Sequence, residues 1–164
     1  MDKQFFTEEV KAQERSLYRI ARSYLWSDAD AADAVQEALT RAWEKRNSLR
    51  EPAFFRTWMT RILINTCKDM LRHAKRSQPM AEVPEIFHIN GREEASRDQE
   101  IRDALSALDA ELRIILTLFY LEGYSLRDIG EMLHLPQGTV KNRLFRGRQK
   151  LREILEEEVL DDEA

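Results

Sequence analysis

The chain has 164 residues and a formal net charge of −4, from 26 Lys and Arg against 30 Asp and Glu. Its single cysteine, Cys67, excludes an internal disulfide bond and a cysteine zinc site, and no apolar run approaches the roughly 20 residues that a membrane-spanning helix needs. With 34% charged residues, five Gly and four Pro, the composition favours an all-α protein of one medium domain or two small ones.

Two helices are predicted at the start of the chain. Residues 7–26 place apolar side chains on one helical stripe, and Ser27 and Asp28 then provide a stop and a new N-cap. The next helix is predicted over residues 30–46, and its buried stripe consists of Ala31, Val35, Ala38, Leu39, Ala42 and Trp43. Its opposite face carries Asp33, Gln36, Glu37 and Thr40. Solubility alone would explain that polar face.

A loop and a long helix follow. Turn-forming residues predict the loop at residues 47–52, and Pro52 restarts the chain as a helix that runs to about Arg76. The predicted core side of this helix consists of Phe55, Trp58, Met59, Ile62, Leu63, Thr66 and Met70, and Cys67 is also expected to be buried. A polar, basic stripe at helical spacing lies away from the core and consists of Arg61, Asn65, Lys68 and Arg72. On local evidence alone, this stripe could be an ordinary solvated face.

Charge is unevenly distributed along the chain. Residues 51–76 carry six basic and two acidic side chains, residues 77–100 carry two basic and six acidic, and residues 153–164 carry seven acidic and none basic. After residue 76 the helical periodicity of apolar residues stops, and the sequence contains Pro79, Pro84 and Gly91. This pattern predicts a flexible acidic linker over residues 77–97, within which residues 83–87 could form a helical turn. Two separated basic segments suggest two separate contacts with DNA.

The last third of the chain is predicted to be a four-helix unit. Helices are expected over residues 98–108 and 109–121, with Ser125 as the N-cap of the next helix. Their predicted core positions are Ile101, Leu105, Leu108, Leu112, Ile115, Leu116 and Phe119.

Residues 126–152 have the pattern of a helix-turn-helix. Leu135 and Pro136 end one short helix and open another, in which Val140, Leu144, Gly147 and Leu151 share a face. We expect Gly147 to allow close approach of a neighbouring helix. Residues 136–152 contain six Lys or Arg and no Asp or Glu, and Arg and Asn side chains on the outer face could reach base edges. The alternative is an ordinary helical hairpin with a solvated basic face.

Nearly the whole chain resembles one family, the extracytoplasmic-function (ECF) group of bacterial RNA polymerase sigma factors. Residues 30–43 and the stretch from Phe55 to Arg72 are similar to region two of that family, and residues 108–151 are similar to region four. The resemblance implies a region-two helical domain over residues 1–76, a linker over 77–97, and a region-four helix-turn-helix domain with an acidic tail over 98–164.

The resemblance also implies three sets of site residues. The set that would bind core polymerase is Asp30, Asp33, Gln36, Glu37 and Thr40. The set that would bind the minus-ten element is Asn47, Ser48, Leu49, Arg50, Arg61, Asn65, Lys68 and Arg72. The set that would bind the minus-thirty-five element is Thr139, Lys141, Asn142, Arg143, Phe145, Arg146 and Lys150. This chain departs from the family pattern at two places in the loop. Leu49 stands where many members carry an aromatic residue, and the loop has Glu51 and Pro52 where a version that contains Gly is common.

The function implied by the resemblance is that of a sigma factor, which binds core RNA polymerase and directs promoter recognition, DNA melting and transcription initiation. The implied partners are core RNA polymerase, promoter DNA and an anti-sigma factor. Neither catalysis nor a cofactor or metal ion is expected, and the N-terminus lacks a signal-peptide pattern, which favours a cytoplasmic protein without membrane insertion. The alternatives are a stand-alone helix-turn-helix regulator and, with less support, an enzyme acting on nucleic acid.

The acidic C-terminal residues 153–163 directly follow the basic helix. If they approach the basic patches in solution, they will compete with DNA phosphates at low salt. The alternative is a disordered, solubilising end.

Overall fold

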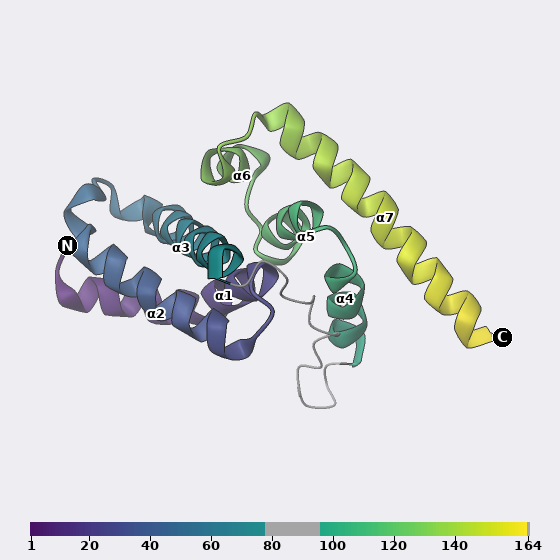
Figure 1. Cartoon of the computed structure of the whole chain (residues 1–164). Helices are drawn as coiled ribbons and strands as arrows, with labels where there is room; N and C mark the ends of the chain where they lie inside the picture. Colours follow the sequence, from purple (N-terminus) through teal and green to yellow (C-terminus); the bar gives the residue numbers. More distant parts are fainter. Residues whose placement is uncertain (78–95, 164) are drawn as a thin grey trace. The chain divides into compact units, whose positions relative to one another are not determined.

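A computed structural model describes residues 1–77 and 96–163, and within those ranges its regular structure is entirely helical (Figure 1). The all-α prediction is confirmed. The chain divides into two compact units, one built on α1–α3 with Glu131–His134, and the other on α4, α5, α7 and the first part of α6. The predicted linker lies outside the described residues except at its ends, where Ser77 belongs to α3 and residues 96–97 belong to α4. None of the described helices has the length and apolar character needed to cross a membrane.

The first two helices are fixed by side-chain caps. In α1 (Lys3–Tyr24), Asp2 accepts a hydrogen bond from the Phe5 amide at 2.8 Å, so the helix begins four residues before its predicted start. In α2 (Asp28–Glu44), the Ser27 hydroxyl accepts a hydrogen bond from the Asp30 amide at 2.9 Å. This confirms the predicted N-cap at Ser27, which satisfies one of the free amides of the first turn.

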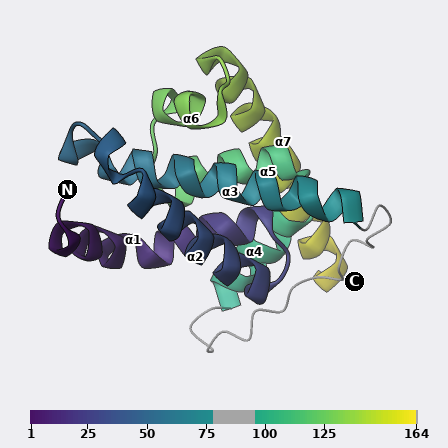
Figure 2. The ribbon, with the colours of Figure 1, turned by 60° about the vertical axis from the view of Figure 1, so that its left-hand side comes forward.

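Helix α2 packs against both α1 and α3 through a stripe of alanines (Figures 1 and 2). The fully buried positions are Ala31, Ala34, Ala38 and Ala42. The predicted positions Val35, Leu39 and Trp43 are only half-buried, so that part of the predicted stripe was wrong. Small side chains let neighbouring helix axes approach closely at the alanines. Trp43 also contacts α1, because its ring centroid lies 5.2 Å from that of Phe6.

Two short 3-10 turns, η1 (Arg46–Ser48) and η2 (Pro52–Phe54), lead into α3 (Phe55–Ser77). Most of its predicted core is confirmed, because Phe55, Met59, Leu63 and Thr66 are buried, whereas Trp58, Ile62 and Met70 are half-buried. Thr60 and Ile64 complete the buried face. Cys67 is fully buried, as predicted, and burial raises the pKa of its thiol to about 12. The thiol is therefore protonated at neutral pH and packs as a small apolar group.

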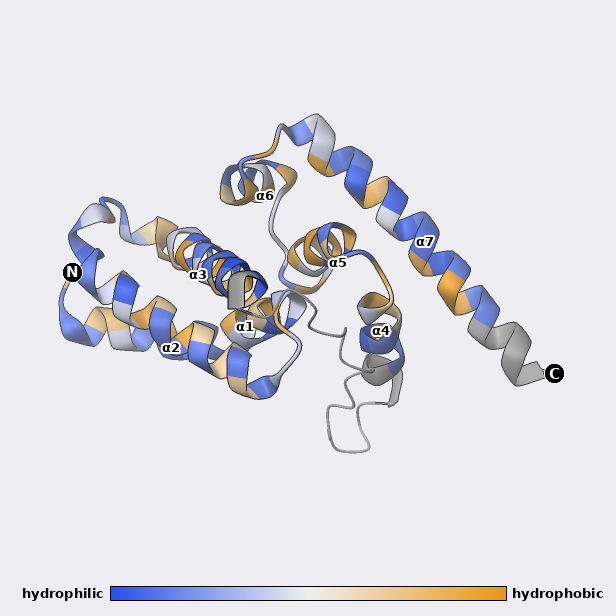
Figure 3. Cartoon of the chain, in the orientation of Figure 1, coloured by the Kyte–Doolittle hydropathy of each residue, from blue (hydrophilic) through white to orange (hydrophobic). Residues whose placement is uncertain are grey.

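The second unit contains α4 (Ser96–Ser106), α5 (Ala110–Leu116), the wider turn η4 (Thr117–Leu121), α6 (Leu126–Leu133) and α7 (Gln137–Glu163). Figure 3 shows α5 with much apolar surface, and residues 112–116 are all buried, four of them apolar and one, Arg113, charged. The predicted core residues Leu105, Leu108, Leu112, Ile115 and Leu116 are confirmed as buried. Ile101 is 41% exposed, so that prediction was wrong, and Phe119 is half-buried.

The predicted helix-turn-helix is present. The Ser125 hydroxyl accepts a hydrogen bond from the Asp128 amide at 3.0 Å and caps α6, as predicted. After α6, His134 adopts a left-handed conformation with φ 57°, and the Leu135 amide donates to the Gly130 carbonyl at 2.9 Å. A Cβ on Gly130 would lie 2.7 Å from the Leu135 oxygen, so this turn requires glycine at that position.

Candidate nucleic-acid interface

The polar face of α2 is a continuous exposed surface. Asp30, Asp33, Gln36, Glu37 and Thr40 are all exposed, on the side opposite the buried alanines. The Thr40 hydroxyl donates to the Gln36 carbonyl at 3.1 Å, and Glu37 accepts a hydrogen bond from Arg41 at 3.2 Å, so both bonds lie within the helix. The structure therefore brings the five residues predicted to bind polymerase onto one face.

The basic stripe of α3 is also exposed. Arg61, Asn65 and Arg72 are exposed and Lys68 is half-buried, on the side of α3 away from Phe55, Met59 and Leu63. These four residues at helical spacing carry three positive charges, on Arg61, Lys68 and Arg72, over about three turns. Such a surface suits a sugar-phosphate backbone.

The loop before α3 is anchored at both ends of η1. The Trp58 indole donates to the Ser48 hydroxyl at 3.2 Å, and that hydroxyl donates to the Lys45 carbonyl at 2.7 Å. The Arg46 guanidinium lies 4.2 Å from the centre of the Trp43 ring and donates to the Trp43 carbonyl at 2.8 Å. In this loop Asn47, Ser48 and Arg50 are exposed and Leu49 is half-buried. The predicted minus-ten residues thus come from a braced loop and the adjoining helix.

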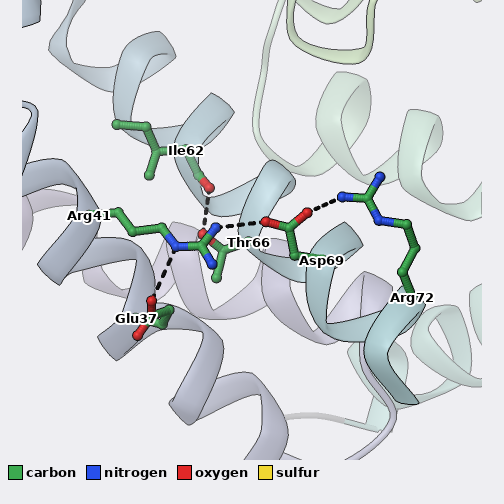
Figure 4. Close-up of polar contacts among 6 residues, drawn as sticks. All are labelled: Glu37, Arg41, Ile62, Thr66, Asp69 and Arg72. Atoms are coloured by element: carbon green, nitrogen blue, oxygen red, sulfur yellow. Dashed lines mark hydrogen bonds and ion pairs between the residues drawn. The ribbon is translucent and has the colours of Figure 1, made fainter. Parts of the chain in front are cut away.

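A charged network joins α2 to α3 (Figure 4). Arg41 donates from Nη1 to Asp69 Oδ2 at 2.8 Å and from Nε to Glu37 Oε1 at 3.2 Å, while Arg72 pairs with the other oxygen of Asp69. The hydrogen bond from Arg41, and then that from Arg72, lowers the pKa of the Asp69 carboxyl. Neither Arg41 nor Asp69 was predicted as a site residue. The three-residue spacing of Asp69 and Arg72 could have indicated their pairing, whereas Arg41 is 28 residues away from Asp69.

The outer face of α7 carries the centre of the predicted minus-thirty-five set. Lys141, Asn142, Phe145 and Arg146 are exposed, whereas Val140 and Leu144 are buried on the opposite side. Gly147 lies against α5, where an added Cβ would be 3.1 Å from a methyl carbon of Leu116. This confirms the prediction that Gly147 allows close approach of a neighbouring helix.

Two of the other members of that set pair with acidic residues at the start of α5, and the third is half-buried. Arg143 pairs with Glu111 at 3.7 Å, Lys150 pairs with Asp109 at 3.6 Å, and Thr139 is half-buried. Arg148 is exposed and donates to the Tyr120 hydroxyl at 3.0 Å. It was not among the predicted site residues, although it belongs to the same basic run. The α7 surface is therefore divided between an outward group and a group with acidic or phenolic partners within the unit.

Two family models match the chain. Residues 10–77 match sigma-70 region 2, and residues 98–151 match sigma-70 region 4. The first match covers α2, the loop and α3, and the second covers α5, α6 and most of α7, so both include the surfaces described above.

Individual relatives cover both matched regions at once. The ECF RNA polymerase sigma factor SigM of Mycobacterium tuberculosis is 32% identical over 155 residues, which is 94% of this chain and 79% of the relative. RNA polymerase sigma factor SigV of Bacillus subtilis is 31% identical over 151 residues, which is 92% of this chain and 91% of the relative. The solved structure of the sigma factor RpoE of Bartonella quintana, in complex with the anti-sigma factor NepR, matches with a TM-score of 0.82 at 25% identity over 92% of this chain and 96% of that one. This chain belongs to the ECF group of bacterial RNA polymerase sigma factors.

Proposed function

We propose that this sigma factor binds core RNA polymerase through the exposed face of α2 and contacts promoter DNA through two surfaces, one in each unit. Residues 1–76 would form the region-two domain, residues 77–97 the linker, and residues 98–164 the region-four domain. The observation that carries this assignment is the presence of exposed basic surfaces on α3 and α7, each opposite a buried apolar face.

The α3 stripe and the loop would hold the melted non-template strand of the minus-ten element. Taking a base out of the stack costs a few kcal/mol, which phosphate contacts and stacking can offset. The outward residues of α7, centred on Asn142 and Arg146, would read the minus-thirty-five element in the major groove. The sigma factor itself breaks and forms no covalent bond in this scheme, because RNA synthesis belongs to the polymerase.

The related RpoE structure was solved with an anti-sigma factor bound. By analogy, we expect this chain to be held inactive by an anti-sigma partner that covers its polymerase-binding or DNA-binding surfaces. The cytoplasm is the expected location, because core polymerase and promoter DNA are found there.

Transcription with purified core polymerase tests the proposal. Core enzyme plus this protein should initiate at one position on a promoter selected from a randomised library, whereas core enzyme alone should not. A stand-alone regulator would instead bind a specific duplex without polymerase and would give no promoter-specific transcript. That outcome would replace the sigma-factor assignment of these surfaces.

A further inference from the structure

Phe54 is an exposed aromatic residue beside a buried one. Its side chain is 63% exposed, more than that of any other large apolar residue in the described part of the chain, whereas Phe55 is 1% exposed. The Phe55 ring lies edge-on to the rings of Phe5 and Phe6, with centroids 5.9 and 5.8 Å away. Phe55 therefore fills the core position, and packing within this unit does not explain why a second aromatic residue precedes it.

Phe54 lies in line with the basic stripe of α3. It precedes Arg61 by seven residues and Arg72 by 18, both close to whole numbers of turns at about 3.6 residues per turn. Phe55 has φ −55° and ψ −46°, so helical geometry extends back to the junction with Phe54. Phe54 thus lies at helical spacing from the stripe, at its N-terminal end and next to the loop over residues 46–51.

The backbone that carries Phe54 is well defined. Its amide donates to the Glu51 carbonyl at 3.0 Å in η2, and Pro52 occupies the first turn. The bond from Trp58 to Ser48 ties the preceding loop to α3. Because this backbone is fixed before a ligand arrives, less conformational entropy is lost on binding than for a flexible loop.

The surroundings of Phe54 are basic. Arg50, Arg56 and Arg61 are exposed, and Glu51 is the single acidic residue between Arg46 and Arg61. Proteins that bind single-stranded nucleic acid combine positive charge along the backbone with aromatic faces on which bases stack. An exposed Phe at the end of a basic stripe has both properties, whereas the half-buried aliphatic Leu49 offers no such face.

We propose that Phe54 stacks on an unpaired base of the non-template strand and so belongs to the minus-ten contact surface. This inference rests on the proposed contact between α3 and melted DNA. It adds a residue to the predicted set, and it assigns the base-stacking contact to η2 rather than to Leu49.

The test uses holoenzyme assembled from core polymerase and the full chain, with Phe54→Ala, Phe54→Leu and Phe54→Trp. The probe is a single-stranded oligonucleotide that carries the non-template minus-ten sequence of a promoter selected by the wild-type holoenzyme. Because a stacked base contributes ~1–3 kcal/mol, Phe54→Ala and Phe54→Leu should weaken binding about five- to 150-fold, and Phe54→Trp should retain it. Leu71→Ala, which truncates an exposed apolar residue of α3 (37% exposed), is the matched control and should bind like wild type.

Abasic substitutions identify the stacked base. At one position, removal of the base should weaken binding by the wild-type holoenzyme but cost the Phe54→Ala holoenzyme almost nothing more. Equal abasic penalties in both proteins at every position would overturn the inference. So would a loss of affinity for core polymerase in Phe54→Ala, because the ring would then contact protein.

Two further variants separate this inference from the proposed function. If Arg61→Ala and Lys68→Ala weaken oligonucleotide binding but Phe54→Ala does not, the stacking assignment alone is wrong. If all three variants bind like wild type, α3 is not a DNA-binding surface, and both the proposed function of α3 and the role of Phe54 are overturned.

Discussion

Arg41 of α2 and Asp69 of α3 form an ion pair with 2.8 Å between Nη1 and Oδ2. Arg41 also pairs with Glu37, and Asp69 with Arg72, so charged contacts run from the proposed polymerase-binding face to the proposed DNA-binding stripe. The Arg41 and Asp69 side chains are 33% and 40% exposed, so solvent screening limits the contribution of the pair to stability to about 1 kcal/mol or less. The pair links side chains of the two proposed surfaces.

The pair predicts a pH dependence of stability. The lowered pKa of Asp69 means that its stabilising effect is complete above the ordinary carboxyl pKa of about 4, and is lost as the pH falls through the lower pKa of the folded state. Asp69→Asn should lower the free energy of unfolding near pH 7 by up to about 1 kcal/mol, and the difference from wild type should shrink in acid. Tryptophan fluorescence during urea unfolding is a suitable measure, because all three tryptophans, Trp26, Trp43 and Trp58, lie in the first unit. A difference that stays constant down to the most acidic pH at which both proteins fold would contradict this explanation.

Polymerase binding should depend on the polar face of α2. The triple change Asp33→Ala, Gln36→Ala and Glu37→Ala should weaken association with core polymerase about tenfold, ~1.4 kcal/mol, without unfolding the protein, because all three side chains are exposed. Fluorescence titration of labelled sigma factor with core enzyme measures the affinity. Glu14→Ala, an exposed acidic residue of α1, is the control and should bind normally. If the triple variant binds core polymerase with unchanged affinity, the polar face of α2 is not the polymerase-binding surface.

Substitutions in the basic surfaces of α3 and α7 should cause different defects in transcription initiation. Asn142→Ala or Arg146→Ala should reduce discrimination among minus-thirty-five variants by ~1–3 kcal/mol, because base contacts carry sequence information. Lys68→Ala or Arg72→Ala should mainly impair open-complex formation. Permanganate footprinting on matched templates distinguishes the two effects. Equal melting defects in both pairs of variants would show that the division between α3 and α7 is wrong.

Three glycines of the second unit should differ in their tolerance of Ala. A Cβ at Gly138 meets nothing within 4 Å, so Gly138→Ala should be neutral or stabilising by up to ~1 kcal/mol through helix propensity. At Gly147 the new atom meets a Leu116 side chain at 3.1 Å, and at Gly130 it meets a backbone oxygen at 2.7 Å. Because a backbone oxygen yields less readily than a flexible side chain, Gly130→Ala should be the most destabilising, by about 1–3 kcal/mol. Unfolding curves followed by circular dichroism should show this order of stability, whereas unfolding of the first unit followed by tryptophan fluorescence should change little. Any other order would contradict the packing described for α6 and α7.

The acidic C-terminus continues α7, and its competition with DNA phosphates stays a prediction. It is not a disordered end, because α7 is one helix from Gln137 to Glu163, and a continuous helix cannot fold back on its own basic face. Arg146 and Glu156 are ten residues apart, about 15 Å along the axis, which exceeds the Debye length of about 8 Å at physiological salt. Combined Glu153→Gln, Glu156→Gln and Glu157→Gln should therefore raise polymerase-free DNA affinity less than about threefold at that salt. A larger increase in gel-shift titrations would show that the acidic residues reach the DNA-binding surfaces by another route.

The sequence alone was sufficient to predict the helical elements, the N-caps at Ser27 and Ser125, the close helix contact at Gly147 and the outward polar faces of α2 and α3. These features depend on hydrogen bonds and periodicities among residues a few positions apart, so they are determined locally. Only the tertiary structure decided which neighbouring side chain enters a contact. It buried Ala34 rather than Val35, because the crossing of packed helices selects the buried side. The pairing of Arg41 with Asp69, and of Arg143 with Glu111, joins residues 28 and 32 positions apart on different helices, and periodicity within one helix carries no information about such contacts.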